Sequence, residues 1–217
     1  MRLNVEHRTH YRYESPAYHA VQSLKLTPAE FEGQKIINWS ITAEGCTIGS
    51  EFTDGNGDII STLTSNGPVE AIEIVVKGEV ETTDTAGVLR GHKERAFPAV
   101  FLRSTPMTKS SAAIRKLADK IAKKTKDGSA LELAHALAAA VGEAIEYAPG
   151  ATHVHTTAAD AIADGKGVCQ DHAHVLISAA RHLGIPARYV SGYLFADHEG
   201  KPHEASHAWA ELHLPEF

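Results

Sequence analysis

The chain has 217 residues, of which 43% are hydrophobic and 22% are charged, and its formal net charge is −6 at pH 7. This length is long for one average domain and sufficient for two small ones, with a composition that is ordinary for a globular protein. No block of Lys and Arg marks a nucleic-acid-binding surface, and no apolar stretch approaches the ~20 residues of a membrane-spanning helix.

The first half of the chain has the pattern of β-strands. Residues 3–13 alternate between a face that begins with Leu3 and Val5 and a polar face, which is the period of a strand with one buried side. Similar strands are expected in Ala20–Pro28, Lys35–Gly45 and Ala71–Asp84. The segment DGNGD at Asp54–Asp58 has the residues of a tight turn. Short strands separated by turns predict an antiparallel β-sandwich-like domain.

Helical periodicity begins after residue 105. Apolar residues recur at helical spacing from Ile114 to Ile121, and Ser110 or Ser111 can cap this helix. A second helix is expected from Ala130 until Pro149 and Gly150 end it. The change of character places a domain boundary within Gly91–Thr105, and we assign residues 1–95 and 96–217 to two domains.

Cys169 lies in the segment DGKGVCQDHAHVLISAARHLGIPARYV, which spans Asp164–Val190. Gly165 and Gly167 allow a sharp turn before it. A helix is predicted to begin at Cys169 and to end at Gly184, before Pro186. The strand Ala187–Phe195 is expected to follow.

A cysteine at a helix N-terminus has two chemical uses. The helix dipole and the free N–H groups there favour a thiolate, which is the nucleophilic form of the side chain. The same N–H groups can donate to an oxyanion. The alternative is a small buried hydrophobic residue, which is the usual role of a free cysteine. Cys46, in the β half, is interpreted as such a buried structural thiol.

A thiolate nucleophile needs a base, which is usually histidine. The segment HEASHAWAELHLP predicts a strand with His207, Trp209 and Glu211 on one face. This strand can return to the end of the sheet at which Cys169 lies. Because the chain has 14 histidines, spacing alone does not distinguish His207 from a surface histidine.

These motifs together resemble the transglutaminase-like superfamily, in the bacterial branch described as transglutaminase-like cysteine proteases. The resemblance covers roughly Thr156–Pro215 and rests on three motifs: the Gly-x-Cys at the helix start, the Gly-Ile-Pro-Ala-Arg that ends the helix, and the His-Ala-Trp strand. The first ~90 residues, with HRTHYRYESP near their start, resemble the N-terminal β domain of bacterial members. The implied fold is α+β, in which an antiparallel β-sandwich-like domain precedes a papain-like core of helices and antiparallel sheet.

The resemblance implies acyl transfer on protein or peptide amide groups. By position, Cys169 matches the nucleophile of the family and His207 its general base, and a thioester forms between attack and release. Gln170, Asp171, Tyr193 and Trp209 are candidate supporting residues. Asp171 is expected to cap the helix or to complement its dipole. Gln170 can offer an amide to the oxyanion, Tyr193 can lie near the thiol, and Trp209 is expected to pack beside the site.

The chain departs from the family at its end. The third catalytic residue of the family is an Asp or Asn on the strand after the histidine strand, whereas this sequence stops at LPEF. Glu211 is four residues from His207, which is more than ~13 Å along a strand and too far for a direct bond. The catalytic core is therefore expected to lack its C-terminal part.

Other functions remain open from the residues alone. Hydrolysis is preferred to cross-linking because no amine-binding pocket is evident, and a non-catalytic protein-binding module with a degenerate core is the alternative. His153 and His155 could share a strand face and bind zinc, but no further metal motif is present, so we expect neither a metal nor a cofactor. Because the first residues, MRLNVEHRTHYRYE, have no apolar signal segment, we expect a reduced cytoplasmic protein without nucleic-acid or membrane partners.

Overall fold

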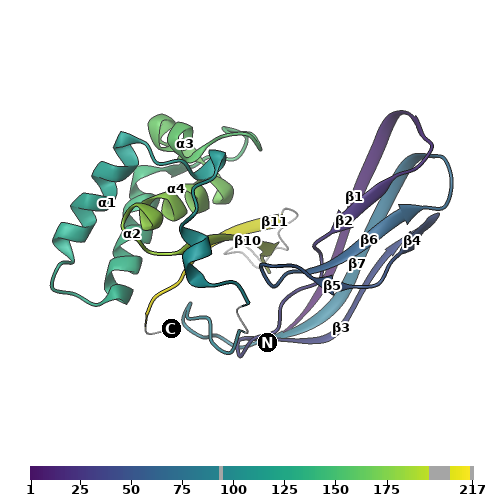
Figure 1. Ribbon diagram of the computed structural model, residues 1–217, viewed down its shortest axis with the longest axis horizontal. Helices are drawn as coiled ribbons and strands as arrows, with labels where there is room; N and C mark the ends of the chain where they lie inside the picture. Colours follow the sequence, from purple (N-terminus) through teal and green to yellow (C-terminus); the bar gives the residue numbers. More distant parts are fainter. Residues whose placement is uncertain (93–94, 196–205, 216–217) are drawn as a thin grey trace. The chain divides into compact units, whose positions relative to one another are not determined.

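Residues 2–82 form an all-β unit in this computed structural model, which describes residues 1–92, 95–195 and 206–215. The strands are β1 (Arg2–Ala17), β2 (Val21–Leu24), β3 (Gln34–Ala43), β4 (Cys46–Ile48), β5 (Phe52–Thr53), β6 (Ile59–Ser65) and β7 (Val69–Thr82). One antiparallel sheet has the order β1-β7-β3, and a second has the order β2-β6-β4 with β5 also paired to β6 (Figure 1). The predicted antiparallel β domain is therefore confirmed.

The core of this unit is shared by both sheets. Leu63 of β6 is fully buried, and Ile72 and Ile74 of β7 are 2% exposed. These side chains belong to one apolar cluster with Leu24 of β2. The alternation predicted for β1 is also present, since Leu3 and Val5 are half-buried whereas their neighbours are exposed.

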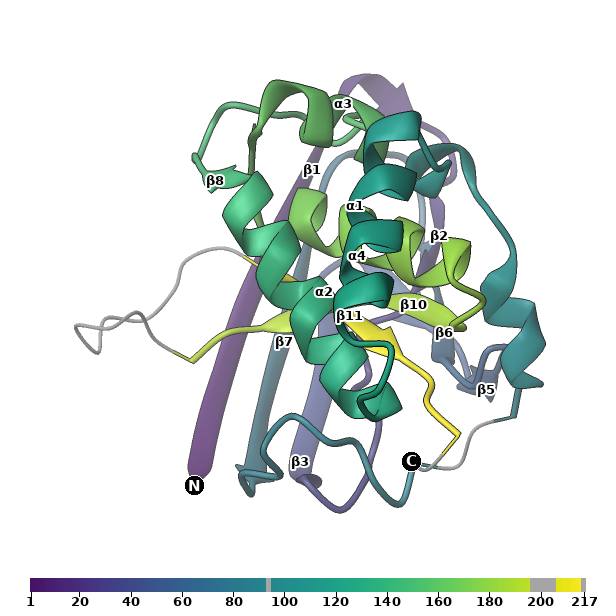
Figure 2. The same cartoon turned by 90° about the vertical axis from the view of Figure 1, so that its left-hand side faces the viewer.

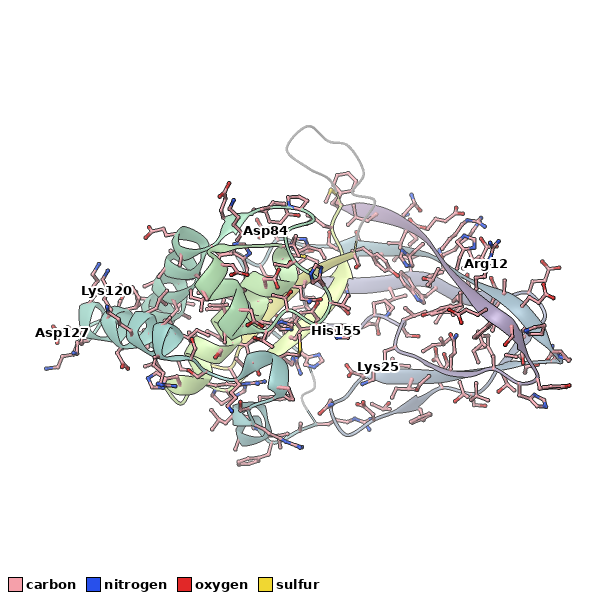
Figure 3. All side chains as sticks on the ribbon, turned by 90° about the horizontal axis from the view of Figure 1, so that it is seen from above. Arg12, Lys25, Asp84, Lys120, Asp127 and His155 are labelled. Atoms are coloured by element: carbon pink, nitrogen blue, oxygen red, sulfur yellow. The ribbon has the colours of Figure 1, made fainter. Side chains whose placement is uncertain are left out.

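The predicted turn at Asp54–Asp58 joins β5 to β6. The Oδ1 atom of Asp54 accepts hydrogen bonds from the backbone N–H groups of Asn56 and Asp58, which closes the turn. Lys25, labelled in Figure 3, places its Nζ 2.8 Å from Asp54 and 2.9 Å from Asp58. The loop after β2 is thereby fixed to this turn.

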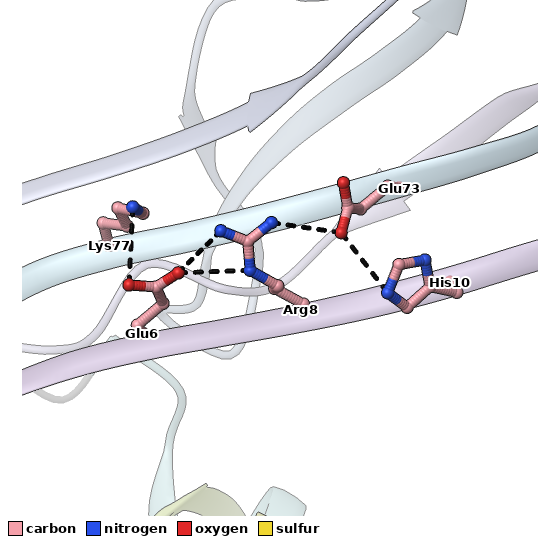
Figure 4. A network of polar contacts seen from close by, with 5 residues as sticks. All are labelled: Glu6, Arg8, His10, Glu73 and Lys77. Atoms are coloured by element: carbon pink, nitrogen blue, oxygen red, sulfur yellow. Dashed lines mark hydrogen bonds and ion pairs between the residues drawn. The ribbon is translucent and has the colours of Figure 1, made fainter.

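Charged side chains form a continuous network across β1 and β7 (Figure 4). Arg8 bonds Glu6 at 2.7 Å and Glu73 at 3.2 Å, Lys77 lies 3.4 Å from Glu6, and His10 lies 3.3 Å from Glu73. The hydrogen bond from Arg8 and the proximity of Lys77 lower the pKa of Glu6. Exposed ion pairs contribute little to stability, so this network marks a solvated sheet face.

The second half of the chain contains helices and two short sheets. The elements are the 3₁₀ turns η1 (Pro98–Leu102) and η2 (Pro106–Thr108), helices α1 (Ala112–Lys124), α2 (Ala130–Ala144), α3 (Ala158–Asp164) and α4 (Cys169–His182), and strands β8 (Glu146–Tyr147), β9 (Lys166–Gly167), β10 (Ala187–Tyr193) and β11 (Ser206–Leu212). The chain divides into two compact units, Met1–Ala96 and Phe97–Phe217. The mixture of helices with antiparallel sheet is the predicted fold class.

Helix α4 is the centre of the second unit (Figure 2). Its Val175 and Ala179 pack into a fully buried cluster with α1, α2 and α3, to which Ile114 and Leu137 belong. On another face, Ile177 and Ala180 pack against Ala187 of β10 and against β11. This double coverage explains why so much of α4 is buried, and it fixes the helix between the helical layer and the β10–β11 pair.

The sequence prediction was wrong about the end of α2. The helix ends at Ala144 rather than at Pro149, because Ile145 is extended and the next residues form β8. Strand β8 pairs in parallel with β9, so that Tyr147 lies opposite Gly167. Helix α3 and both of these short strands were not predicted. Among the described residues, the helices are too short or too polar to cross a membrane.

Candidate active site

Cys169 is the first residue of α4, as predicted. The chain reaches it through α3, which ends at Gly165 with a φ of 65°, and then through β9. Val168 is extended and occupies the N-cap position of the helix. The Cys169 side chain is half-buried, and both cysteines of the chain are free thiols. Cys169 therefore lies in the first turn, where an α-helix has backbone N–H groups without acceptors four residues earlier.

Asp171 holds the turn before Cys169, which agrees with its expected capping role. It is fully buried, and its Oδ2 atom accepts hydrogen bonds from the N–H of Val168 at 2.8 Å and from the hydroxyl of Thr152 at 2.6 Å. A Cβ on Gly167 would lie 2.6 Å from the Cβ of Asp171, so only glycine fits there. As a carboxylate that accepts these bonds, Asp171 supports the turn and cannot donate to an oxyanion.

His207 and Cys169 line the same pocket, which has a volume of about 290 Å³. His207 lies near the start of β11, opposite Gly192 of β10. The predicted return of this strand to the Cys169 end of the sheet is thus what the structure shows. The remaining lining residues are Ala138, Val141, Gly142, Tyr147, His172, Ala173, Leu176, Ala208, Trp209 and Ala210. A thiol and an imidazole therefore face one largely apolar cavity.

Trp209 packs beside His207, as expected. The two ring centroids are 4.6 Å apart in an edge-to-face arrangement, and Trp209 is 38% exposed. A Cβ on Gly192 would come within 3.2 Å of the Trp209 ring, so the glycine opposite His207 makes room for the indole. The indole limits the orientations that the imidazole can take.

Two tyrosines of β10 lie on one strand face, and the prediction named only Tyr193. Burial raises the pKa of Tyr193. Burial also raises the pKa of Tyr189, and the charges of Cys169 and Asp171 add to this effect. Tyr189 packs against the buried His174 at 5.2 Å between ring centroids. Tyr189 therefore lies within electrostatic range of the thiol, and no motif in the sequence singled it out.

Two further residues considered from the sequence have defined positions. Gln170 is the second residue of α4 and is half-buried, next to Cys169 in the first helical turn. Glu211 pairs with Arg188, whose Nε lies 2.6 Å from its Oε2. The Glu211 carboxylate is thus paired with a residue of the neighbouring strand β10. This agrees with the expectation that Glu211 does not orient His207.

Sequence reasoning missed the place of His172 in the site. Its ring lies on the pocket wall, with Nδ1 2.9 Å from the carbonyl oxygen of Val168 and Nε2 3.0 Å from that of Ile145. The only available signal was its position one helical turn after Cys169. His153 and His155 lie in a loop rather than on a strand, and the described part of the chain has no cluster of three or more potential metal ligands.

Comparisons with known proteins found matching family models, sequence relatives and a solved structure. A family model described as the transglutaminase-like superfamily matches residues 115–217, and one described as the bacterial transglutaminase-like N-terminal region matches residues 3–81. An uncharacterized protein of Mycobacterium leprae is 30% identical over 97% of this chain and 78% of its own length. An uncharacterized protein of Mycobacterium tuberculosis is 28% identical over 99% of this chain and 74% of its own length.

A solved structure has the same fold. The crystal structure of a candidate cysteine protease from Cytophaga hutchinsonii superimposes with a TM-score of 0.71, covers 98% of this chain and 72% of that chain, and is 23% identical in sequence. At this identity the likeness concerns the fold. The matched region includes residues of both units of the chain.

Proposed function

Because the chain belongs to the transglutaminase-like superfamily, we propose that it is a thiol enzyme that transfers acyl groups from protein or peptide amides. The observation that carries this proposal is the common pocket of Cys169 and His207, with the thiol at the start of α4. A nucleophile and a base on one cavity are the minimum for covalent acyl transfer.

The reaction proceeds in two halves. The Cys169 thiolate attacks the amide carbonyl, and the N–H groups of the first turn of α4 stabilise the oxyanion. His207 protonates the leaving nitrogen as the C–N bond breaks, so that a thioester to Cys169 remains and an amine or ammonia departs. An acceptor then attacks the thioester while His207 removes its proton, and the thiol is restored.

We propose water as the acceptor, which makes the enzyme a hydrolase. Support comes from the pocket walls, which are mostly alanine, valine, leucine and glycine. Among the described residues, no carboxylate lines the pocket, so the cavity offers no counter-charge to the ammonium group of a lysine. A competing amine acceptor is therefore not favoured by the charge of this cavity.

The first test is the pH dependence of Cys169 alkylation by iodoacetamide in a Cys46→Ala background. We expect rapid alkylation of the folded protein well below about pH 8.5, at which a free cysteine is half ionised. His207→Ala should shift the profile to higher pH, because the imidazolium that stabilises the thiolate is lost. A Cys169 that reacts only after denaturation, or a profile that ignores His207, would contradict the proposal and favour a non-catalytic binding module.

The acceptor is tested separately with a glutamine-rich protein substrate and a fluorescent primary amine. Mass spectrometry distinguishes peptide cleavage or deamidation from amine incorporation, and Cys169→Ala is the inactive control. We expect hydrolysis products even when the amine is in excess. Amine incorporation as the main product would overturn the hydrolase assignment but would leave the thioester mechanism intact.

A further inference from the structure

The His172 ring lies between two backbone carbonyl groups that belong to different elements. Nδ1 is 2.9 Å from the oxygen of Val168, which directly precedes Cys169. Nε2 is 3.0 Å from the oxygen of Ile145, which directly follows α2. The imidazole thus connects the turn that carries the nucleophile to the end of the helix on the other side of the pocket.

The chemistry of the two contacts depends on the protonation state of the ring. A carbonyl oxygen only accepts hydrogen bonds, and a neutral imidazole has one N–H and one lone pair. The neutral ring can therefore bond one of the two carbonyls, while its other nitrogen faces an oxygen without a proton between them. Only the protonated ring donates to both carbonyls, and these bonds are charge-assisted.

The groups around the His172 ring are those of the candidate active site. Cys169 lies one helical turn earlier on the same side of α4, and Asp171 is the preceding residue. The Tyr147 ring of β8 is 6.4 Å away, and His207 of β11 lines the same pocket. Helix α2 contributes only Ala138, Val141 and Gly142 to this pocket, so it adds no charge.

We propose that His172 is a positioning residue for Cys169. In its protonated form the ring ties Val168 to Ile145, fixes the turn before the nucleophile, and adds a positive charge to the pocket that holds the thiol. We call these two hydrogen bonds the His172 bridge. The effect of the bridge on catalysis rests on the proposed acyl transfer, whereas the bridge itself does not. Because both ring nitrogens of His172 face backbone carbonyls, it acts through Val168 and through the field at the thiol.

The bridge is tested by NMR on the full chain with ¹⁵N-labelled histidine. Long-range ¹H–¹⁵N spectra report how many protons the ring carries, and His172→Gln identifies its signals. We expect protons on both ring nitrogens at the acidic end of the range in which the protein is folded. When the ring loses one of them, the amide signals of Val168 and Cys169 should move at the same pH. A ring that keeps one proton throughout, or one that titrates without affecting these amides, overturns the proposal.

Its effect on the thiol is tested by alkylation in the Cys46→Ala background. We expect His172→Phe to slow alkylation of Cys169 about three- to tenfold at about pH 6, which is the size of effect that one nearby charge produces. The difference should shrink as the pH rises, because an imidazole loses its charge with increasing pH. A deficit that is equal at all pH values indicates a structural role alone and contradicts the proposal. His135→Phe, at an exposed position of α2, is the matched control and should change nothing.

These results separate the two proposals. If Cys169 reactivity depends on His207 but not on His172, the acyl-transfer proposal stands and the positioning role is wrong. If His172 titration moves the Cys169 amide but no amide substrate is turned over, the positioning role stands and the acyl-transfer proposal is wrong. Circular dichroism of each variant shows whether it is folded, and the NMR titration of the wild type needs no variant beyond the assignment.

Discussion

One face of α4 carries three buried polar atoms without a hydrogen-bond partner within the described ranges. They are Oδ1 of Asp171, Nδ1 of His174 and Oγ of Ser178. These residues are three and four positions apart, so they follow one side of the helix. A buried polar atom without a partner costs about 1–3 kcal/mol. The pKa of His174 is lowered by burial, so the cost of its unpartnered ring nitrogen changes with pH.

The structure predicts that His174 makes folding sensitive to acid. Burial lowers the pKa of His174 from its usual value of 6.5, and the Asp171 charge opposes this only in part. The unfolded chain takes up a proton as the pH falls through about 6.5, whereas the folded protein does so only at lower pH. The stability that depends on the neutral ring is therefore complete above about pH 6.5 and is lost as the pH falls toward the folded pKa.

His174→Phe keeps a ring against Tyr189 but removes the titration. Urea unfolding at about pH 7.5 and about pH 5.5 should show that the wild type loses more free energy of unfolding than the variant does, by about 1 kcal/mol. His135→Phe, which is exposed, should retain the wild-type pH dependence. An unchanged pH dependence in His174→Phe would show that the ring is protonated alike in the folded and unfolded chains.

Elements that are short in the sequence determine the start of α4. Strands β8 and β9 contain two residues each, yet their pairing delivers the chain to Val168 and Cys169. Ala148 adds a bond from its N–H to the carbonyl of Gly167 at 2.9 Å. The position of Cys169 therefore depends on the backbone conformation of β9, which leaves no room for a side chain at Gly167.

Two glycine substitutions test this steric argument, because we expect them to change the stability with opposite signs. Gly167→Ala should destabilise the protein by about 1–3 kcal/mol, since the new methyl group would overlap the buried and doubly bonded Asp171. It should also reduce the alkylation rate of Cys169 in the folded protein. Gly142→Ala, within α2, is the matched control: a Cβ there meets nothing within 4 Å, so we expect a gain of about 0.5–1 kcal/mol. Thermal unfolding of both variants measures the two signs, and a neutral Gly167→Ala would disprove the steric argument.

Sequence patterns predicted the long helices and strands. They missed short elements and element ends that depend on contacts with distant parts of the chain. Alternation predicted β1 and β7, and the glycine turn with the proline stop predicted α4. The end of α2 could not be predicted, because Ile145 continues the helical stripe and leaves the helix only to let β8 pair with β9. Helix α3 has seven residues, which is too few for a clear period.

The residues of the site also divide into those that local motifs predicted and those that they did not. The motifs named Cys169 and His207, and the structure places both on one pocket. They did not name Tyr189 or His172, because each side chain has a contact that lies far away in the sequence. The contacts of His172 to Ile145 and of Thr152 to Asp171 bridge 27 and 19 residues, and no local pattern encodes such pairs.

At the scale of the whole molecule, the two units have cores with no residue in common. The N-terminal cluster contains Leu63 and the strands around it, and the helical cluster contains Leu137 with α1, α3 and α4. Each of these leucines is fully buried. Residues that share a core unfold together, whereas separate cores allow separate transitions.

We therefore predict that Leu63→Ala and Leu137→Ala act on different transitions. Each substitution leaves a cavity in one core and should cost about 3 kcal/mol there. Calorimetry of the wild type should resolve two transitions, of which Leu63→Ala lowers one and Leu137→Ala lowers the other. Because Cys169 and His207 belong to the helical unit, Leu137→Ala should also expose Cys169 to alkylation at a lower temperature, and Leu63→Ala should not. If either substitution shifts both transitions equally, the two cores unfold as one cooperative unit and the stability of the candidate site depends on the β domain as well.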